Sequence, residues 1–146
     1  MGVIGMQPLV RFRPTVHSSL WSKFEKLDVV GSGSFGTALL CKRKSDACLI
    51  VLKQVDLQSM SASDRKSAVK EAELLSILKH ENIVTYYGCH SCDGQLFIEM
   101  EYCEMGTLAH FLNRVTKPLD ELDVLSIFRQ IACALSYLDE MNILHR

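Results

Sequence analysis

The sequence lacks any apolar run approaching the roughly 20 residues that a membrane-spanning helix needs. It also lacks an excess of charge, since 16 basic residues stand against 17 acidic ones. That balance gives no electrostatic case for nucleic acid or an anionic membrane as the main partner. No acidic residue precedes Glu25, and residues 1–22 are expected to form a poorly ordered tail, with a short targeting leader as the alternative.

The cysteines give little support for a disulfide framework or a metal centre. The six cysteines are irregularly spaced and no secretory signal is visible. Cys89 and Cys92 have the C-x-x-C spacing of zinc and redox sites, but no second pair accompanies them. We therefore expect buried or half-buried thiols in a reducing cytosol and no metal site.

A glycine-rich segment after an apolar run carries the first functional signal. The chain reads V-V-G-S-G-S-F-G-T-A-L-L-C from Val29. Glycine permits a positive φ and a close approach of the backbone to a ligand, so such a loop can offer its N–H groups to phosphate. The loop is expected to comprise Gly31, Ser32, Gly33, Ser34, Phe35 and Gly36.

The spacing G-x-G-x-x-G also fits a dinucleotide-binding fold, in which the loop opens a helix and an acidic residue follows about 20 positions later. Asp56 follows Gly36 by 20 positions and meets that requirement. However, residues 37–47 lack a 3.6-residue period, because their apolar residues come first and their polar residues after them. A strand, a turn at residues 44–46 and a second strand fit this segment better.

One lysine interrupts the second of these strands. Lys53 directly follows the apolar run L-I-V-L at residues 49–52. A lysine on an edge strand, with its stem along the apolar surface, is a routine feature of sheets. This stretch alone therefore leaves an edge lysine and a functional lysine about equally open.

A helix is predicted next, between about residues 61 and 79. Ala68, Ala72 and Leu75 share one apolar stripe, and Glu71 lies beside it. Neither Glu71 nor Glu73 has a lysine four positions later, so a helical ion pair does not account for either carboxylate.

Two further strands and then helices complete the pattern. Apolar runs at residues 83–87 and 96–102 flank an Asp93-Gly94 turn, which is a strong hairpin signal. A short helix is expected at residues 108–115 and a longer one at about 121–142, capped by Asp120. The chain is thus predicted to be an α+β protein: a five-stranded antiparallel sheet with one inserted helix, followed by helices.

Taken in order, these segments resemble the first part of a protein kinase domain over residues 24–146. G-S-G-S-F-G-T-A resembles the kinase glycine loop, I-V-L-K the lysine motif, and I-L-H-R the start of the catalytic loop. The helix that follows the lysine motif in kinases, helix C, resembles E-A-E-L-L-S-I-L-K-H-E-N-I-V. The linker between the two kinase lobes resembles I-E-M-E-Y-C-E-M-G-T-L. K-Q-V-D-L, N-I-V-T-Y-Y and E-M-E-Y-C are most similar to the NIMA-related serine/threonine kinases.

The resemblance implies a nucleotide site in a kinase small lobe at residues 23–104, followed by the start of a truncated large lobe at residues 105–146. It implies that Lys53 contacts the α- and β-phosphates of ATP and that Glu71 holds Lys53 by an ion pair. The other implied contacts are the apolar Val30, Ala38 and Val51 around the adenine, Met100 as gatekeeper, and the backbone of Glu101 and Cys103 at the adenine edge.

Three positions depart from the kinase pattern. Ala38 stands where valine is usual, Val51 where alanine is usual, and Thr107 where an acidic or amide residue is frequent. The first two changes offset each other in volume if the side chains pack together. Thr107 leaves the ribose contacts in doubt.

The printed sequence ends at His145-Arg146, before the family's catalytic aspartate and magnesium-binding D-F-G. We therefore expect ATP as the ligand, no magnesium ligands in this chain, and no phosphoryl transfer by the chain alone. The alternative is a non-catalytic interaction or competitor module. For the complete kinase, the resemblance implies a protein substrate and a cytoplasmic location with association to the cytoskeleton or cilium.

Overall fold

The computed structural model describes residues 13–14, 17–33 and 36–145. The chain divides into two units. The first combines the residues up to Leu78 with Thr85–Tyr102, and the second combines Lys79–Val84 with the residues from Cys103 onward.

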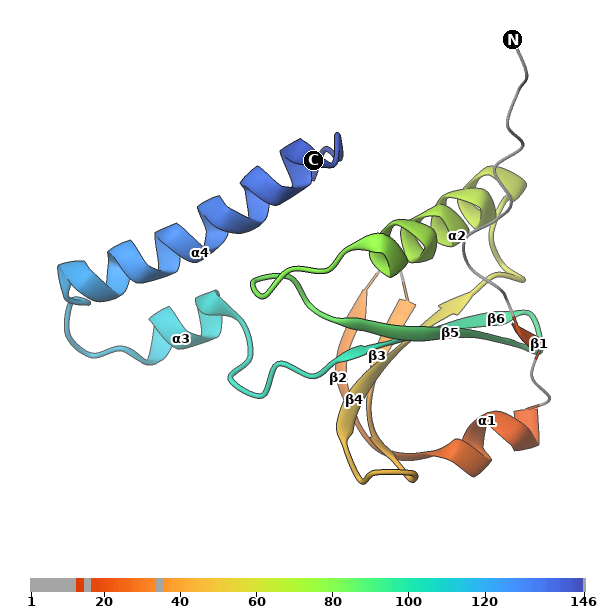
Figure 1. Ribbon diagram of the computed structural model, residues 1–146. Coiled ribbons are helices and arrows are strands. Elements are labelled where there is room, and N and C mark those ends of the chain that lie inside the picture. The colour runs from red at the N-terminus through yellow and green to blue at the C-terminus, as the bar shows by residue number, and fades with distance from the viewer. Residues whose placement is uncertain (1–12, 15–16, 34–35, 146) are drawn as a thin grey trace, which may run out of the picture. The chain divides into compact units, whose positions relative to one another are not determined.

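A twisted sheet forms the centre of the first unit (Figure 1). Its strands follow the spatial order β1-β5-β6-β4-β3-β2, and all pairs except β1–β5 are antiparallel. The strands are β1 (Arg13–Pro14), β2 (Phe24–Gly33), β3 (Gly36–Arg43), β4 (Leu49–Asp56), β5 (Tyr86–Cys92) and β6 (Gln95–Glu101). The predicted five-stranded antiparallel sheet is therefore confirmed, and the two-residue strand β1 extends it in parallel beside β5.

The segment that distinguishes the two glycine-loop folds is a strand. Residues 36–43 form β3, and a turn at residues 44–46 leads towards β4. Arg43 closes this hairpin by donating its backbone N–H to the carbonyl of Cys48 at 2.8 Å. The helix that a dinucleotide-binding fold requires after the glycines is absent from residues 36–46. Burial instead alternates along β3, where Leu39 and Cys41 are buried and Leu40 between them is partly exposed.

The hairpin between β5 and β6 has the predicted Asp93-Gly94 turn. Both residues have positive φ, 48° at Asp93 and 74° at Gly94. Two successive positive φ values match the twist of the flanking strands. The carbonyl of Gly94 accepts a hydrogen bond from the Leu57 N–H at 3.0 Å, so the turn also fixes the end of β4.

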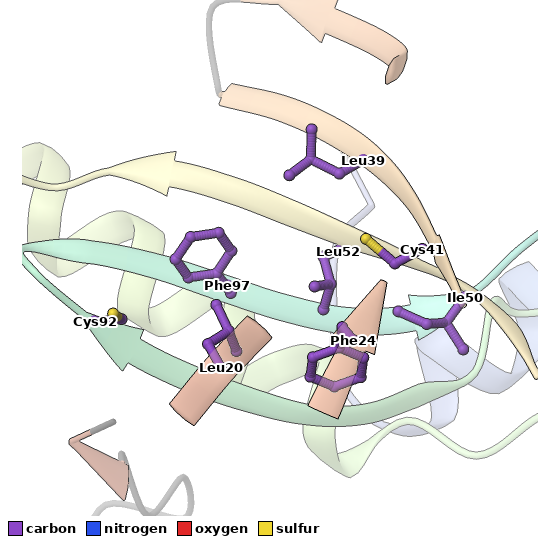
Figure 2. Packing of buried hydrophobic residues seen from close by; sticks show 8 residues of the cluster. All are labelled: Leu20, Phe24, Leu39, Cys41, Ile50, Leu52, Cys92 and Phe97. Carbon is purple, nitrogen blue, oxygen red and sulfur yellow. The ribbon is translucent and has the colours of Figure 1, made fainter. Parts of the chain in front are cut away.

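Alternation along the strands gives the sheet two apolar faces. One face carries a cluster of eight buried residues (Figure 2), namely Leu20, Phe24, Leu39, Cys41, Ile50, Leu52, Cys92 and Phe97. The other face packs against helix α2 (Ala62–Ile77), which contributes the buried Ala72 and the partly buried Ala68 and Leu75 of the predicted stripe. Ser61 caps α2, and its side chain accepts a hydrogen bond from the Asp64 N–H.

Part of the expected N-terminal tail is a structured element. His17–Lys23 forms helix α1 within the range expected to be a poorly ordered tail; residues 1–12 and 15–16 of that range lie outside the described part. Leu20 of α1 is fully buried against the sheet, and the Trp21 ring meets the Phe97 ring edge-on at 6.0 Å. Burial of one leucine side chain stabilises a fold by about 1.5–3 kcal/mol, which offsets the weak helical tendency of so short a segment.

The second unit is helical. It contains α3 (Leu108–Arg114) and α4 (Glu121–Glu140), and Asp120 caps α4 as predicted by accepting a hydrogen bond from the Leu122 N–H at 2.7 Å. The Tyr137 hydroxyl accepts a hydrogen bond from the Lys79 N–H at 3.0 Å. None of the helices in the described residues is both long enough and apolar enough to cross a membrane.

Candidate functional site

Lys53 lies on a central strand, not at an edge. Strand β4 is bordered by β3 and β6, and Lys53 pairs with Ala38 on one side and with Ile98 on the other. By alternation it shares a face with Val55, which packs in the α2-facing cluster. An edge lysine that blunts strand pairing is therefore excluded. The Lys53 side chain is 25% exposed, and its position on the face of the sheet that packs against α2, called the inner face from here on, requires a partner on that face.

Helix α2 supplies the partner. The Lys53 Nζ lies 2.6 Å from the Glu71 Oε1, which is the distance of a charge-assisted hydrogen bond. Ala68, Ala72 and Leu75 anchor α2 against the sheet and thereby fix the rotation of the helix that points Glu71 towards the strand. The approach of Lys53 and Glu71 predicted from the sequence is confirmed.

The glycine segment connects β2 and β3, and one of its glycines is required by geometry. Gly36 has a φ of 122°, and a Cβ there would collide with the backbone oxygen of Gln54 on β4. Gly33 has open space where a Cβ would stand, and Gly31 has only ordinary contact with Ala38. Ser34 and Phe35 lie outside the described residues.

Three of the expected adenine contacts, Ala38, Val51 and Met100, lie on the same face of the sheet as Lys53. Ala38 pairs directly with Lys53, and Val51 pairs with Met100 across the β4–β6 ladder. Ala38, Val51 and Met100 are partly exposed there, so a patch of apolar side chains is open on this face. Val30 is 45% exposed and lies at a register shift between β2 and β3.

The linker residues divide between the two units. Glu101 ends β6, its backbone N–H donates to the Thr85 carbonyl at 2.9 Å, and its carboxylate accepts from the Thr85 N–H and hydroxyl. The Glu101 N–H and carboxylate are therefore both engaged with Thr85. Cys103 is exposed and belongs to the second unit.

A buried charge cluster on the opposite face was not anticipated. The Glu99 side chain is 8% exposed, and its carboxylate accepts a hydrogen bond from Arg43 at 2.8 Å and lies 3.5 Å from the His90 Nε2. Arg43 also binds Asp46, and this hydrogen bond holds the pKa of Asp46 below its usual value. The signal in the sequence was a single glutamate inside the apolar run of β6.

The C-x-x-C residues are buried thiols. Cys89 and Cys92 lie on β5, and burial raises the pKa of Cys89 to about 11, which disfavours the thiolate that metals and redox reactions use. In the described residues, no group of three or more His, Cys, Asp or Glu side chains is placed to hold a metal ion.

Comparison with known proteins assigns a class to this arrangement. The family model of the protein kinase domain matches residues 24–146, and the chain belongs to that family. The match includes the glycine segment, Lys53, Glu71 and the linker.

The curated relatives narrow the similarity to the NIMA-related (Nek) serine/threonine kinases, which are transferases. The chain is 43% identical over 127 residues to the probable serine/threonine-protein kinase nek3 of Dictyostelium discoideum, covering 85% of this chain and 11% of that protein. It is 41% identical over 125 residues to Nek8 of Danio rerio, covering 85% and 18%. It is 45% identical over 120 residues to Nek4 of Mus musculus, covering 81% and 15%. The chain thus spans less than a fifth of the length of each of these three relatives.

Proposed function

We propose that this chain is the ATP-binding part of a serine/threonine protein kinase, with residues 23–104 as the small lobe and residues 105–146 as the start of the large lobe. The observation that carries the proposal is the ion pair between Lys53 and Glu71 on the inner face of the sheet. A held ammonium suits phosphoryl transfer, which depends mainly on positioning and on charge stabilisation.

The residues present fit a nucleotide. Gly36 allows the backbone of β3 to lie close to Gln54 of β4, and the glycine segment that it ends can offer backbone N–H groups to phosphate. Lys53 supplies the positive charge for the phosphates, while Ala38 and Val51 offer apolar surface for the base. The resemblance to protein kinases implies that the backbone carbonyl of Glu101 accepts a hydrogen bond from the exocyclic amine of adenine.

The family's magnesium ligands are not assigned to this chain. Protein kinases use ATP with Mg²⁺, which takes oxygen ligands such as carboxylates. Among the described residues, no group of three or more His, Cys, Asp or Glu side chains is placed to hold a metal ion, and no step is assigned to the metal here. In the complete kinase we propose transfer of the γ-phosphoryl group: the bond from the γ-phosphorus to the β-phosphate oxygen breaks and ADP leaves, a bond to a Ser or Thr hydroxyl oxygen forms, and the hydroxyl proton passes to solvent. We also infer, from the Nek resemblance, a cytoplasmic location with association to the cytoskeleton or cilium.

Nucleotide binding by this chain tests the proposal. A fluorescent ATP analogue should bind the wild-type chain, and Lys53→Met should weaken the affinity by about tenfold, because one charge-assisted contact is lost. Lys42→Met is the control, since Lys42 is an exposed lysine on β3 with no ion pair in the described residues. Equal affinities for the wild type and Lys53→Met would contradict the assignment.

The proposal includes the expectation that the 146-residue chain alone transfers no phosphate. Lys53 orients the donor but provides neither a metal ligand nor a group that orients the acceptor hydroxyl. Radiolabelled transfer from ATP, abolished by Lys53→Met in the same chain, would refute this expectation.

A second candidate function rests on α4. Its apolar residues are widely exposed, with Leu122 at 74% and Phe128 at 68%. Exposed apolar faces of this kind favour association with another protein. A non-catalytic interaction module is therefore the alternative, and it would be favoured if nucleotide binding failed while a folded 146-residue chain persisted in cells.

A further inference from the structure

A cavity of about 310 Å³ opens between helix α2 and the end of strand β4. Its floor consists of the buried side chains of Val55 and Ile98. The half-buried Met60 and Ala68 form its walls. This volume lies at the lower end of the range of small-molecule sites, about 300–1,000 Å³, so the cavity suits a compact ligand with an apolar body.

The rim of the cavity is polar and carries negative charge. Ser59, Asp64, Ser67 and Glu71 line it with exposed side chains, and no lysine or arginine is among the lining residues. The Lys53 ammonium already neutralises Glu71 at 2.6 Å. Asp64 accepts a hydrogen bond from the Ser61 hydroxyl at 2.7 Å, but it forms no ion pair within the described ranges.

Asp64 is therefore the rim carboxylate that has no ion-pair partner among the described residues, although it lies in the first turn of α2. Ser67 follows it by three positions on α2, so their side chains are neighbours on the same helical face. Glu71 lies two helical turns from Asp64, about 10 Å along the axis, which is too far for one ammonium group to bind both carboxylates. An ammonium at this end of the cavity would meet the Asp64 carboxylate and the Ser67 hydroxyl. A phosphate there would face an unpaired carboxylate.

We propose that this cavity is a binding site for a small arylalkyl amine, with its ring on Val55 and Ile98 and its ammonium against Asp64 and Ser67. The cavity shares Glu71 with the proposed nucleotide site, but the proposed ammonium contact lies on Asp64, two helical turns from Glu71. A ligand there joins α2 to β4, the two elements that bring Glu71 and Lys53 together. Its binding therefore stabilises the small lobe by mass action.

Tryptamine is the probe, and tryptophol, in which a hydroxyl replaces the ammonium, is its neutral counterpart. The full 146-residue chain is titrated with each, and the methyl NMR signals of Ala68, Ile98, Val55 and Met60 are followed. We expect these four signals to move with tryptamine. Tryptophol should bind about twofold to fivefold more weakly, which is the range for one exposed ion pair.

Charge variants at the rim test the position of the ammonium. Asp64→Asn should weaken the affinity for tryptamine about twofold to fivefold and leave the affinity for tryptophol unchanged. Asp123→Asn, in the first turn of α4, is the matched control and should change neither. Ser67 is exposed, so a substitution there is expected to be tolerated. Ser67→Arg should weaken the affinity for tryptamine because the added charge repels the ammonium, and Ser67→Glu should strengthen that affinity. These two variants keep the test decisive if Asp64→Asn perturbs the start of α2.

Three results would overturn the inference: equal binding of the two probes, no response to the charge variants, or signal changes confined to methyl groups outside the cavity. Lys53→Met separates this inference from the proposed nucleotide function. That variant should lose ATP affinity while retaining tryptamine affinity at least equal to wild type. If ATP fails to bind but tryptamine behaves as described, only the nucleotide proposal falls.

Discussion

Lys53 and Glu71 meet across the inner face of the sheet at 2.6 Å, although the two residues belong to a strand and a helix separated by 18 positions. Glu73, only two positions further along α2, forms no ion pair within the described residues. The difference follows from helical geometry, because two positions rotate a side chain by about 200° around the axis. The rotation of α2, fixed by Ala72 in the core, thus selects the carboxylate that meets the lysine.

Glu71→Gln is expected to reduce affinity for an ATP analogue about twofold to fivefold, because the Lys53 ammonium is then no longer held by an opposite charge. Glu73→Gln removes the same charge from the same helix and should change the affinity little. Fluorescence titration of both variants measures the difference. A larger effect at Glu73 than at Glu71 would show that the observed ion pair is not the one that supports binding.

Gly36→Ala is expected to destabilise the first unit by about 1–3 kcal/mol, because its φ of 122° is unfavourable for alanine and its Cβ would collide with the Gln54 carbonyl. Gly33→Ala is the control, since Gly33 has open space at that position. We expect it to change the free energy of unfolding by less than about 0.5 kcal/mol. Urea denaturation followed by circular dichroism gives both values, and equal losses for the two variants would contradict the strain argument.

Arg43→Met is expected to destabilise the protein by about 3–5 kcal/mol, because it leaves the Glu99 carboxylate buried without its main partner. The double variant Arg43→Met, Glu99→Leu removes both charges and should recover most of that loss. Chemical denaturation of the wild type, both single variants and the double variant forms a complete thermodynamic cycle. A double variant as unstable as Arg43→Met would mean that packing rather than charge pairing determines the cost.

Much of the fold could be predicted because its signals are local. The Asp93-Gly94 turn, the strand period of β3 and the Asp120 cap each depend on residues close in sequence. Helix α1 could not be predicted, because its seven residues carry only Leu20 and Trp21 as apolar contacts and have no readable period. Its structure depends on burial against strands that follow it in the chain.

In the candidate site, too, some features could be predicted from local sequence signals and others could not. Each of Lys53 and Glu71 stood out as a charge in an apolar pattern, and the resemblance to protein kinases implied that the two form a pair. The partner of Glu99 could not be predicted, because Arg43 lies 56 positions away and reaches it only through the pairing order of the strands. A sequence period identifies the face of a residue but not its neighbour on an adjacent strand.

The buried thiols should make the protein less stable at alkaline pH. Burial raises the pKa of Cys41 and of Cys89 from near 9 to about 11, so each folded thiol keeps its proton where the unfolded thiol has lost it. Between these two values the folded state binds more protons, and the free energy of unfolding therefore falls as pH rises. Below pH 9 both states keep the proton and the effect vanishes.

Urea denaturation at pH 8 and at pH 10 measures the loss of unfolding free energy. Replacing both buried thiols, by Cys41→Ala and Cys89→Ala, should flatten this pH dependence, whereas replacing the exposed Cys103 and Cys133 should not. A pH dependence that is unchanged in the Cys41 and Cys89 variant would assign the alkaline loss to other groups.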